Sequence, residues 1–195
     1  MDGLGWMYGA DLPLLSLTFA RGVTARELLD RMDVDPLSVA LRSKDQFYED
    51  FGDILSDDDS FVVSAGKYGD WAWAWEHASW RNVEEPGLLL RVSEGTVAMV
   101  LHMNEKPMVD FRDAEAGELV VDINTILSLR AEDRTGSEPD FLDRELVALG
   151  ADPEADEEGP LGLRGLFFRL VEGFGAGLPL ADLMDNPRVS GRLYP

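Results

Sequence analysis

Two histidines, His77 and His102, are the only imidazole side chains in the sequence. Histidine suits general-base catalysis or metal binding because its pKa lies near neutrality. His77 ends a tryptophan-rich segment, and His102 lies in an expected strand. Neither belongs to an HExxH motif or to a histidine pair spaced i, i+4, so we interpret both as structural. No catalytic residue is predicted.

Other catalytic and cofactor-binding motifs are missing from the sequence. There is no cysteine, which excludes disulfides, thiolate zinc sites, iron–sulfur clusters and a cysteine nucleophile. Serine-nucleophile motifs and nucleotide-binding glycine loops do not occur. The glycine-rich residues 173–177 follow an expected helix, where glycine ends helices, whereas a phosphate-binding loop precedes one. We therefore expect no cofactor and no metal.

Two acidic runs are candidate binding segments. They comprise Asp57, Asp58 and Asp59 in the first run, and Asp152, Glu154, Asp156, Glu157 and Glu158 in the second. The alternating carboxylates of the second run resemble the start of an EF-hand loop. However, Glu157 stands where that loop requires glycine, and Leu163 stands where it requires glutamate. We therefore predict solvated charge runs that offer binding residues but no calcium site.

Three tryptophans alternate with alanines in the segment of residues 71–76. Period two places Trp71, Trp73 and Trp75 on one face of a strand, and the alanines on the other. Three indoles on one face would suit a stacking platform for a sugar, or a binding patch for a protein. The alternative is a sheet face buried under helices. We favour burial and retain the three tryptophans as candidate binding residues.

The net charge is −21, from 38 acidic and 17 basic residues. Acidic residues outnumber basic ones in each third of the chain. Such a field repels nucleic-acid phosphates and anionic membrane surfaces, and it attracts basic proteins. A basic protein is therefore the expected partner. The same acidity also fits a protein that charge keeps soluble, or a GC-rich genome in which arginine outnumbers lysine.

Length and hydropathy indicate one domain in the cytoplasm. A chain of 195 residues, 45% of them hydrophobic, can bury a core of its own, so we expect a single domain over residues 1–195. Residues 1–9 lack the basic region of a signal peptide. No run approaches the ~20 apolar residues of a membrane span. The expected location is the cytoplasm.

Strand-like segments dominate the first two thirds of the chain. They are rich in β-branched and aromatic residues and are separated by glycine- and aspartate-containing turns. They lie at residues 14–20, 61–65, 71–76, 96–103, 107–113 and 118–124. The short connections imply an N-terminal strand, a tryptophan hairpin and a three-strand antiparallel meander.

Helix signals separate and follow these strands. Capping boxes are expected at Thr24 and at Ser43, because Glu or Gln stands three residues after each hydroxyl. Further helices are expected at residues 84–93, after residues 137–140, after Pro160 and at residues 180–184, before an irregular tail. The pattern predicts an α+β fold. Helices would pack on one side of a mostly antiparallel sheet, and residues 151–195 would form a helical C-terminal segment.

Several landmarks recur in a recognisable order along nearly the whole chain. They are FARGVT at residues 19–24, GDWAWAWE at 69–76, SEGT at 93–96, GELV at 117–120, GSEPD at 136–140, and the LVE, LPL and NP segments of residues 170–187. In this order the chain resembles an uncharacterised domain-of-unknown-function family common in filamentous actinobacteria. The resemblance implies the element order and a bacterial cytosolic context, and it implies no site. The long segment before residue 61 and its acidic run depart from the family's pattern.

We therefore expect a non-enzymatic interaction protein. Its sharpest form is an immunity or antidote protein that masks a basic, nucleic-acid-directed toxin, because carboxylates would cover a cationic active site. The alternative is a small-molecule or carbohydrate binding module that uses the tryptophan face. A third hypothesis is a hydrolase with an unfamiliar carboxylate or histidine set, for which the sequence suggests no substrate.

Overall fold

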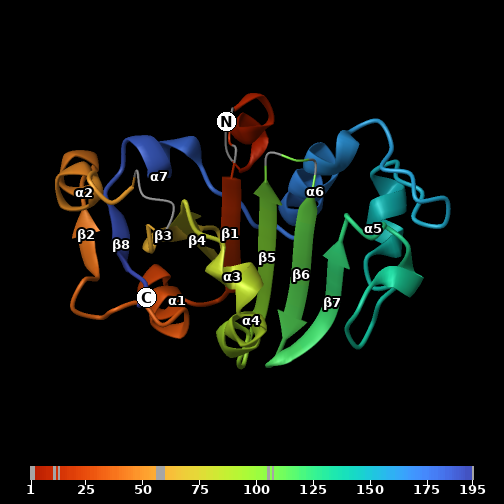
Figure 1. The fold of residues 1–195 in the computed structure, drawn as a ribbon, viewed down its shortest axis with the longest axis horizontal. Coiled ribbons are helices and arrows are strands. Elements are labelled where there is room, and N and C mark those ends of the chain that lie inside the picture. The colour runs from red at the N-terminus through yellow and green to blue at the C-terminus, as the bar shows by residue number, and fades with distance from the viewer. Residues whose placement is uncertain are drawn as a thin grey trace.

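An antiparallel sheet of eight strands runs through the molecule (Figure 1). The computed structural model describes residues 3–10, 12, 14–55, 60–104, 106 and 108–194. In that part of the chain the strand order is β2-β8-β3-β4-β1-β5-β6-β7. The strands are β1 (Leu14–Arg21), β2 (Ala40–Arg42), β3 (Val62–Tyr68), β4 (Trp71–His77), β5 (Val97–Asn104), β6 (Val109–Glu115), β7 (Glu118–Asn124) and β8 (Arg188–Arg192). The predicted α+β class and the mostly antiparallel sheet are confirmed.

Helices occupy the connections between strands and most of the last third of the chain. They are the 3-10 helices η1 (Gly5–Gly9) and η2 (Ala131–Asp133), and the α-helices α1 (Ala25–Arg31), α2 (Lys44–Phe51), α3 (Arg81–Glu84), α4 (Pro86–Val92), α5 (Asp143–Ala148), α6 (Gly162–Gly173) and α7 (Leu180–Met184). None of these helices is long and apolar enough to cross a membrane.

The two predicted capping boxes are confirmed. Thr24 Oγ1 accepts from the Glu27 backbone N–H, and the Glu27 carboxylate accepts from the Thr24 N–H. Ser43 and Gln46 make the same reciprocal pair at the start of α2. The glycine-rich end of α6 is also a helix end, as expected, because Gly175 adopts the left-handed φ of +80°.

The hairpin of β3 and β4 forms with a shorter turn than expected. β3 continues to Tyr68, so the reversal needs only Gly69 and Asp70, and Gly69 has a φ of +57°. Gly66 pairs with Trp73 across the hairpin. A Cβ at Gly66 would lie 2.3 Å from a carbon of the Trp73 ring. The glycine therefore makes room for a fully buried indole.

Helices cover both faces of the sheet, which corrects the expectation of a one-sided layer. One face carries Trp73, Leu101 and Phe111 and packs against η1, α5 and α6. The opposite face carries Ala74 and Val100 and packs against α1 and α4. Six consecutive residues of β1 are buried. A near-continuous apolar strand of this kind is typical of a sheet that is covered on both sides.

The C-terminal tail also differs from the expectation. Residues after α7 were expected to be irregular, but β8 inserts between β2 and β3 in the middle of one half of the sheet. β8 contains two arginines, a serine and a glycine, so it lacks the apolar alternation that predicts a strand. β8 forms because it pairs with β3, whose residues lie more than 120 positions earlier in the chain. The segment of residues 151–195 is therefore only partly helical.

Candidate functional site

The second acidic run forms a tight hairpin. Backbone hydrogen bonds join Asp152 and Glu157 in both directions, at 2.8 and 2.9 Å. Asp156 adopts a left-handed φ of +62°, which aspartate tolerates better than most residues. The Asp152 Oδ1 accepts from the Ala155 N–H at 3.1 Å and closes the turn. This acidic hairpin (residues 152–157) is thus held by its own backbone and side chains.

The carboxylates of this run divide into two groups. The Asp156 Oδ1 accepts from the Leu129 N–H at 2.7 Å, and the Glu158 Oε2 accepts from the Leu163 N–H at 3.2 Å. Asp156 and Glu158 therefore accept from backbone outside the hairpin, whereas Asp152 closes the turn within it. Glu154 and Glu157 are exposed, and neither carboxylate has a hydrogen bond or ion pair within the described residues. Those two charges are available to a partner.

Two hollows beside the hairpin form one acidic groove. Their volumes are about 350 and about 390 Å³. They share Asp143, Pro153 and Glu154, so we treat them as continuous. The residues that line this acidic groove are Arg130, Ala131, Glu132, Asp143, Val147, Ala151, Asp152, Pro153 and Glu154. Four of these nine residues are acidic and one is basic, so the groove favours a cation.

A buried arginine, Arg134, connects the residues that form the wall of the groove. The Arg134 side chain is 1% exposed and lies 2.7 Å from the Asp143 carboxylate. Its guanidinium also donates to the carbonyl oxygens of Leu129 and Pro139. Because Leu129 in turn donates to Asp156, the arginine links the base of α5 to the acidic hairpin. The groove walls are therefore pre-organised.

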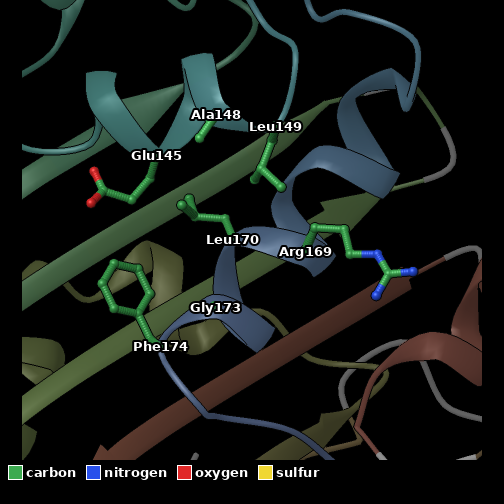
Figure 2. Close-up of a pocket in the computed structure, with 7 residues that line it drawn as sticks. All are labelled: Glu145, Ala148, Leu149, Arg169, Leu170, Gly173 and Phe174. Atoms are coloured by element: carbon green, nitrogen blue, oxygen red, sulfur yellow. The ribbon is translucent and has the colours of Figure 1, made fainter.

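A second hollow, largely apolar, lies between α5 and α6 (Figure 2). Its volume is about 420 Å³, and Leu149 and Leu170 lie at its centre. Its full lining is Glu145, Ala148, Leu149, Arg169, Leu170, Gly173 and Phe174. Figure 2 shows the Glu145 carboxylate at one end and the Arg169 guanidinium directed away at the other. We call this hollow the apolar pocket.

The tryptophans of β4 belong to the core. Trp71, Trp73 and Trp75 are 4%, 0% and 9% exposed, which confirms the interpretation that favoured burial. The Trp71 Nε1 donates to the Phe174 carbonyl at 3.0 Å, and the Trp75 ring stacks on His77. A sugar platform needs exposed indole faces, and these three side chains do not offer them.

The first acidic run, Asp57 to Asp59, lies outside the described residues. In the rest of the chain, no group of three or more His, Cys, Asp or Glu side chains could hold a metal ion.

His77 lies in a buried network at the other half of the sheet. Its Nε2 is 2.9 Å from the Ser64 Oγ, which also accepts from the Arg188 Nε at 3.1 Å. Burial, with Arg188 as the second cause, lowers the pKa of His77 to about 3, so the ring is neutral at pH 7. A serine–histidine pair resembles a nucleophile and its base. Ser64 is fully buried, however, and out of reach of a substrate.

His102 belongs to a polar row that the sequence reasoning missed. Ser16, His102, Asp110 and Asn124 pair in succession across β1, β5, β6 and β7. Burial, followed by the nearby Arg112 charge, lowers the pKa of His102 to about 4. The signal was present as polar residues at period two within apolar strands. The first three members are 4% exposed or less, which argues for a structural role.

A second buried carboxylate anchors α3 beside this row. Glu76 accepts from the Ser79 hydroxyl at 3.0 Å and from the Asn82 N–H at 3.2 Å. Asn82 also bonds to Ser16 and Thr18 of β1. Burial nevertheless raises the pKa of Glu76 to about 7. Every partner in this network is internal, so it positions α3 on the sheet.

Comparison with known proteins defines the family. A model of a family of unknown function, DUF6461, matches residues 14–163. The matched region begins with β1 and includes the tryptophan strand and the acidic hairpin, and β8 lies beyond it. Searches of curated proteins and of solved structures gave no match. Because the match covers more than half of the chain, the protein belongs to the DUF6461 family of unknown function.

Proposed function

We propose that this protein is a non-enzymatic interaction protein that binds a basic protein partner through the acidic groove. The observation that carries the proposal is the state of Glu154. Its exposed carboxylate lines both halves of the groove, and it has no partner among the described residues. An unpaired surface carboxylate beside a pre-organised wall is suited to a Lys or Arg side chain.

The charge of the whole chain supports the same partner. A net charge of −21 produces a long-range attraction for a basic protein. Electrostatic attraction of this kind raises the association rate more than it raises the affinity. The acidic groove would then supply a specific contact site for the partner's basic side chains, which the net charge of the whole chain does not provide.

The sharpest form of the proposal is an immunity or antidote protein. Such a protein would cover the cationic active site of a toxin that acts on nucleic acid, and its carboxylates would replace phosphates there. The resemblance to an actinobacterial family and the cysteine-free composition support a place in the bacterial cytoplasm. Cell fractionation with an antibody to the protein tests that location.

The carbohydrate-binding alternative has no comparable support. It requires accessible indole faces on Trp71, Trp73 and Trp75, and all three are at most 9% exposed. We therefore propose the groove alone as the binding site.

Affinity capture with matched variants tests the proposal. The groove variant carries Glu132→Gln, Glu154→Gln and Glu157→Gln, all at exposed positions. The control variant carries Asp30→Asn, Glu49→Gln and Asp70→Asn, which are exposed on α1, on α2 and in the β3–β4 turn. Both variants lose three negative charges, so they differ only in where the charge is lost.

We expect the wild-type and control proteins to retain the same basic protein from a cell lysate at low salt. Mass spectrometry identifies the retained protein. The groove variant should retain much less of it, and added salt should release it from all three proteins. Equal retention by the groove and control variants would contradict the proposal, because net charge alone would then explain binding.

A further inference from the structure

The apolar pocket and the acidic groove lie on two flanks of the same short helix. We propose that the docking segment of the partner crosses α5, with an apolar side chain in the apolar pocket and a Lys or Arg side chain in the acidic groove. This inference rests on the proposed function, and it adds the chemistry of the segment that binds.

The periodicity of α5 separates the two hollows. Glu145, Ala148 and Leu149 line the apolar pocket, whereas Asp143 and Val147 line the acidic groove. At about 100° per residue, these two sets point to different sides of the helix. α5 therefore forms a ridge between an apolar hollow and an acidic one.

The apolar pocket suits the side chain of a peptide. Its volume of about 420 Å³ lies within the usual range of ligand pockets, about 300–1,000 Å³. Leu149, Leu170 and Phe174 supply an apolar lining. Val147, on the groove flank of α5, is 59% exposed, so the groove also offers apolar surface to the partner. An apolar side chain, such as Leu or Phe, fits this lining.

The charges around α5 favour a cationic residue near that apolar side chain in the partner's segment. Glu145 stands at one end of the pocket, and Asp152 and Glu154 stand in the groove. Arg169, the basic residue of the pocket, is 3.1 Å from the Glu172 carboxylate and points away from the centre. Arg144 is the one basic residue in the sequence of α5, and it is exposed. The acidic residues that line the groove outnumber its one basic residue, Arg130, so the net charge of the groove favours Lys or Arg on the partner.

The width of the ridge sets the spacing of the two side chains. A helix with its side chains is about 10–12 Å across. An extended segment rises about 3.3 Å per residue. The apolar side chain and the cationic side chain of the partner should therefore stand about three or four positions apart.

Three labelled peptides test this spacing by fluorescence anisotropy with the full chain. Each has ten residues on a Gly/Ser background. The anchor peptide carries Leu, with Lys three and four positions later. The charge-only peptide has Ser in place of that Leu, and the short-spacing peptide carries the two Lys residues one and two positions after Leu. We expect the anchor peptide to bind about tenfold more tightly than either control, as for an anchor side chain in an interface.

A protein variant with a filled apolar pocket complements the peptide controls. Gly173 lies in α6 and lines the pocket, and a Cβ there meets nothing within 4 Å, so Gly173→Leu should fill the pocket without strain. Gly87 in α4 has the same open surroundings, so Gly87→Leu is the control. The Gly173→Leu variant should bind the anchor and charge-only peptides equally, whereas the control keeps the tenfold preference. Arg144→Gln should tighten the binding of both peptides a few fold.

The outcomes separate this inference from the proposed function. If the charge-only peptide binds as tightly as the anchor peptide, or if Gly173→Leu keeps the preference, the inference is wrong while groove binding stands. If no peptide binds, the inference is also wrong, and the capture experiment decides the proposed function. If the Glu132/Glu154/Glu157 variant binds all peptides as the wild type does, both are wrong.

Discussion

The tryptophan strand and the acidic hairpin are two unusual stretches of the sequence, and the structure buries the first and exposes the second. Both supplied candidate binding residues. The structure buries the indoles of β4 in the centre of the sheet and leaves all five acidic residues of the second run exposed. Figure 1 shows α5, beside this hairpin, at one end of the sheet and α2 at the other. A distinctive sequence feature is thus a guide to function only once its exposure is known.

The largest expected effect comes from the tryptophan strand. Trp73→Ala removes a fully buried indole and should lower the free energy of unfolding by about 3–5 kcal/mol. Urea denaturation followed by circular dichroism measures it. Trp80→Ala, at a side chain that is 41% exposed, should cost less than about 1 kcal/mol. Similar values for the two variants would contradict the assignment of Trp73 to the core.

A buried carboxylate provides the next contrast with the exposed hairpin. The pKa of Glu76 is raised from 4.5 to about 7 by burial. The folded state therefore holds this proton more tightly than the unfolded state does. Its stabilising contribution is complete below pH 4.5 and is lost as pH rises through 7. The shift corresponds to about 3 kcal/mol.

Glu76→Gln should abolish that component of the pH dependence. The free energy of unfolding of the wild type, relative to this variant, should fall by about 3 kcal/mol between pH 4 and pH 8. Denaturation curves at several pH values measure the difference. Parallel curves for wild type and Glu76→Gln would contradict the buried assignment.

Gly66 tests the packing around the tryptophans directly. A methyl group there would lie 2.3 Å from the Trp73 ring, so Gly66→Ala must displace the indole or the backbone. We expect a loss of about 2 kcal/mol of stability, as for an overpacked core. The same change at Gly87, where a Cβ is unobstructed, should be neutral or stabilising. Thermal denaturation of the two variants suffices to compare them.

Within the acidic hairpin, the smallest effects should separate structural from available carboxylates. Asp156→Ala removes the acceptor for the Leu129 N–H and should cost about 1 kcal/mol of stability. Glu154→Ala should change stability by less than about 0.5 kcal/mol and weaken binding of a basic partner. Equal losses of stability would show that Glu154 also has a structural role.

Local signals predicted most of the elements. The capping boxes at Thr24 and Ser43 and the tryptophan hairpin depend on residues close in sequence, so they were predicted correctly. β8 and the second helical layer depend on contacts between distant residues. No local pattern in the Arg188–Arg192 segment indicates its place between β2 and β3.

The candidate site was predictable to a similar extent. The exposure of the second acidic run follows from its composition. The role of Asp156 does not, because its backbone partner, Leu129, lies 27 residues earlier and reaches it only in the folded chain. The apolar pocket requires α5 and α6 to lie side by side, which helical periodicity alone does not show.

The most direct test of binding at the acidic groove follows the groove and the tryptophan strand in one experiment. Uniformly ¹⁵N-labelled protein is titrated with the anchor peptide, and amide and indole chemical shifts are followed by NMR. We expect shifts in α5, in residues 152–157 and at the end of α6, with none in β4 beyond Trp71, which bonds to Phe174. Shifts centred on the Trp73 and Trp75 indoles, with the acidic hairpin unchanged, would contradict it.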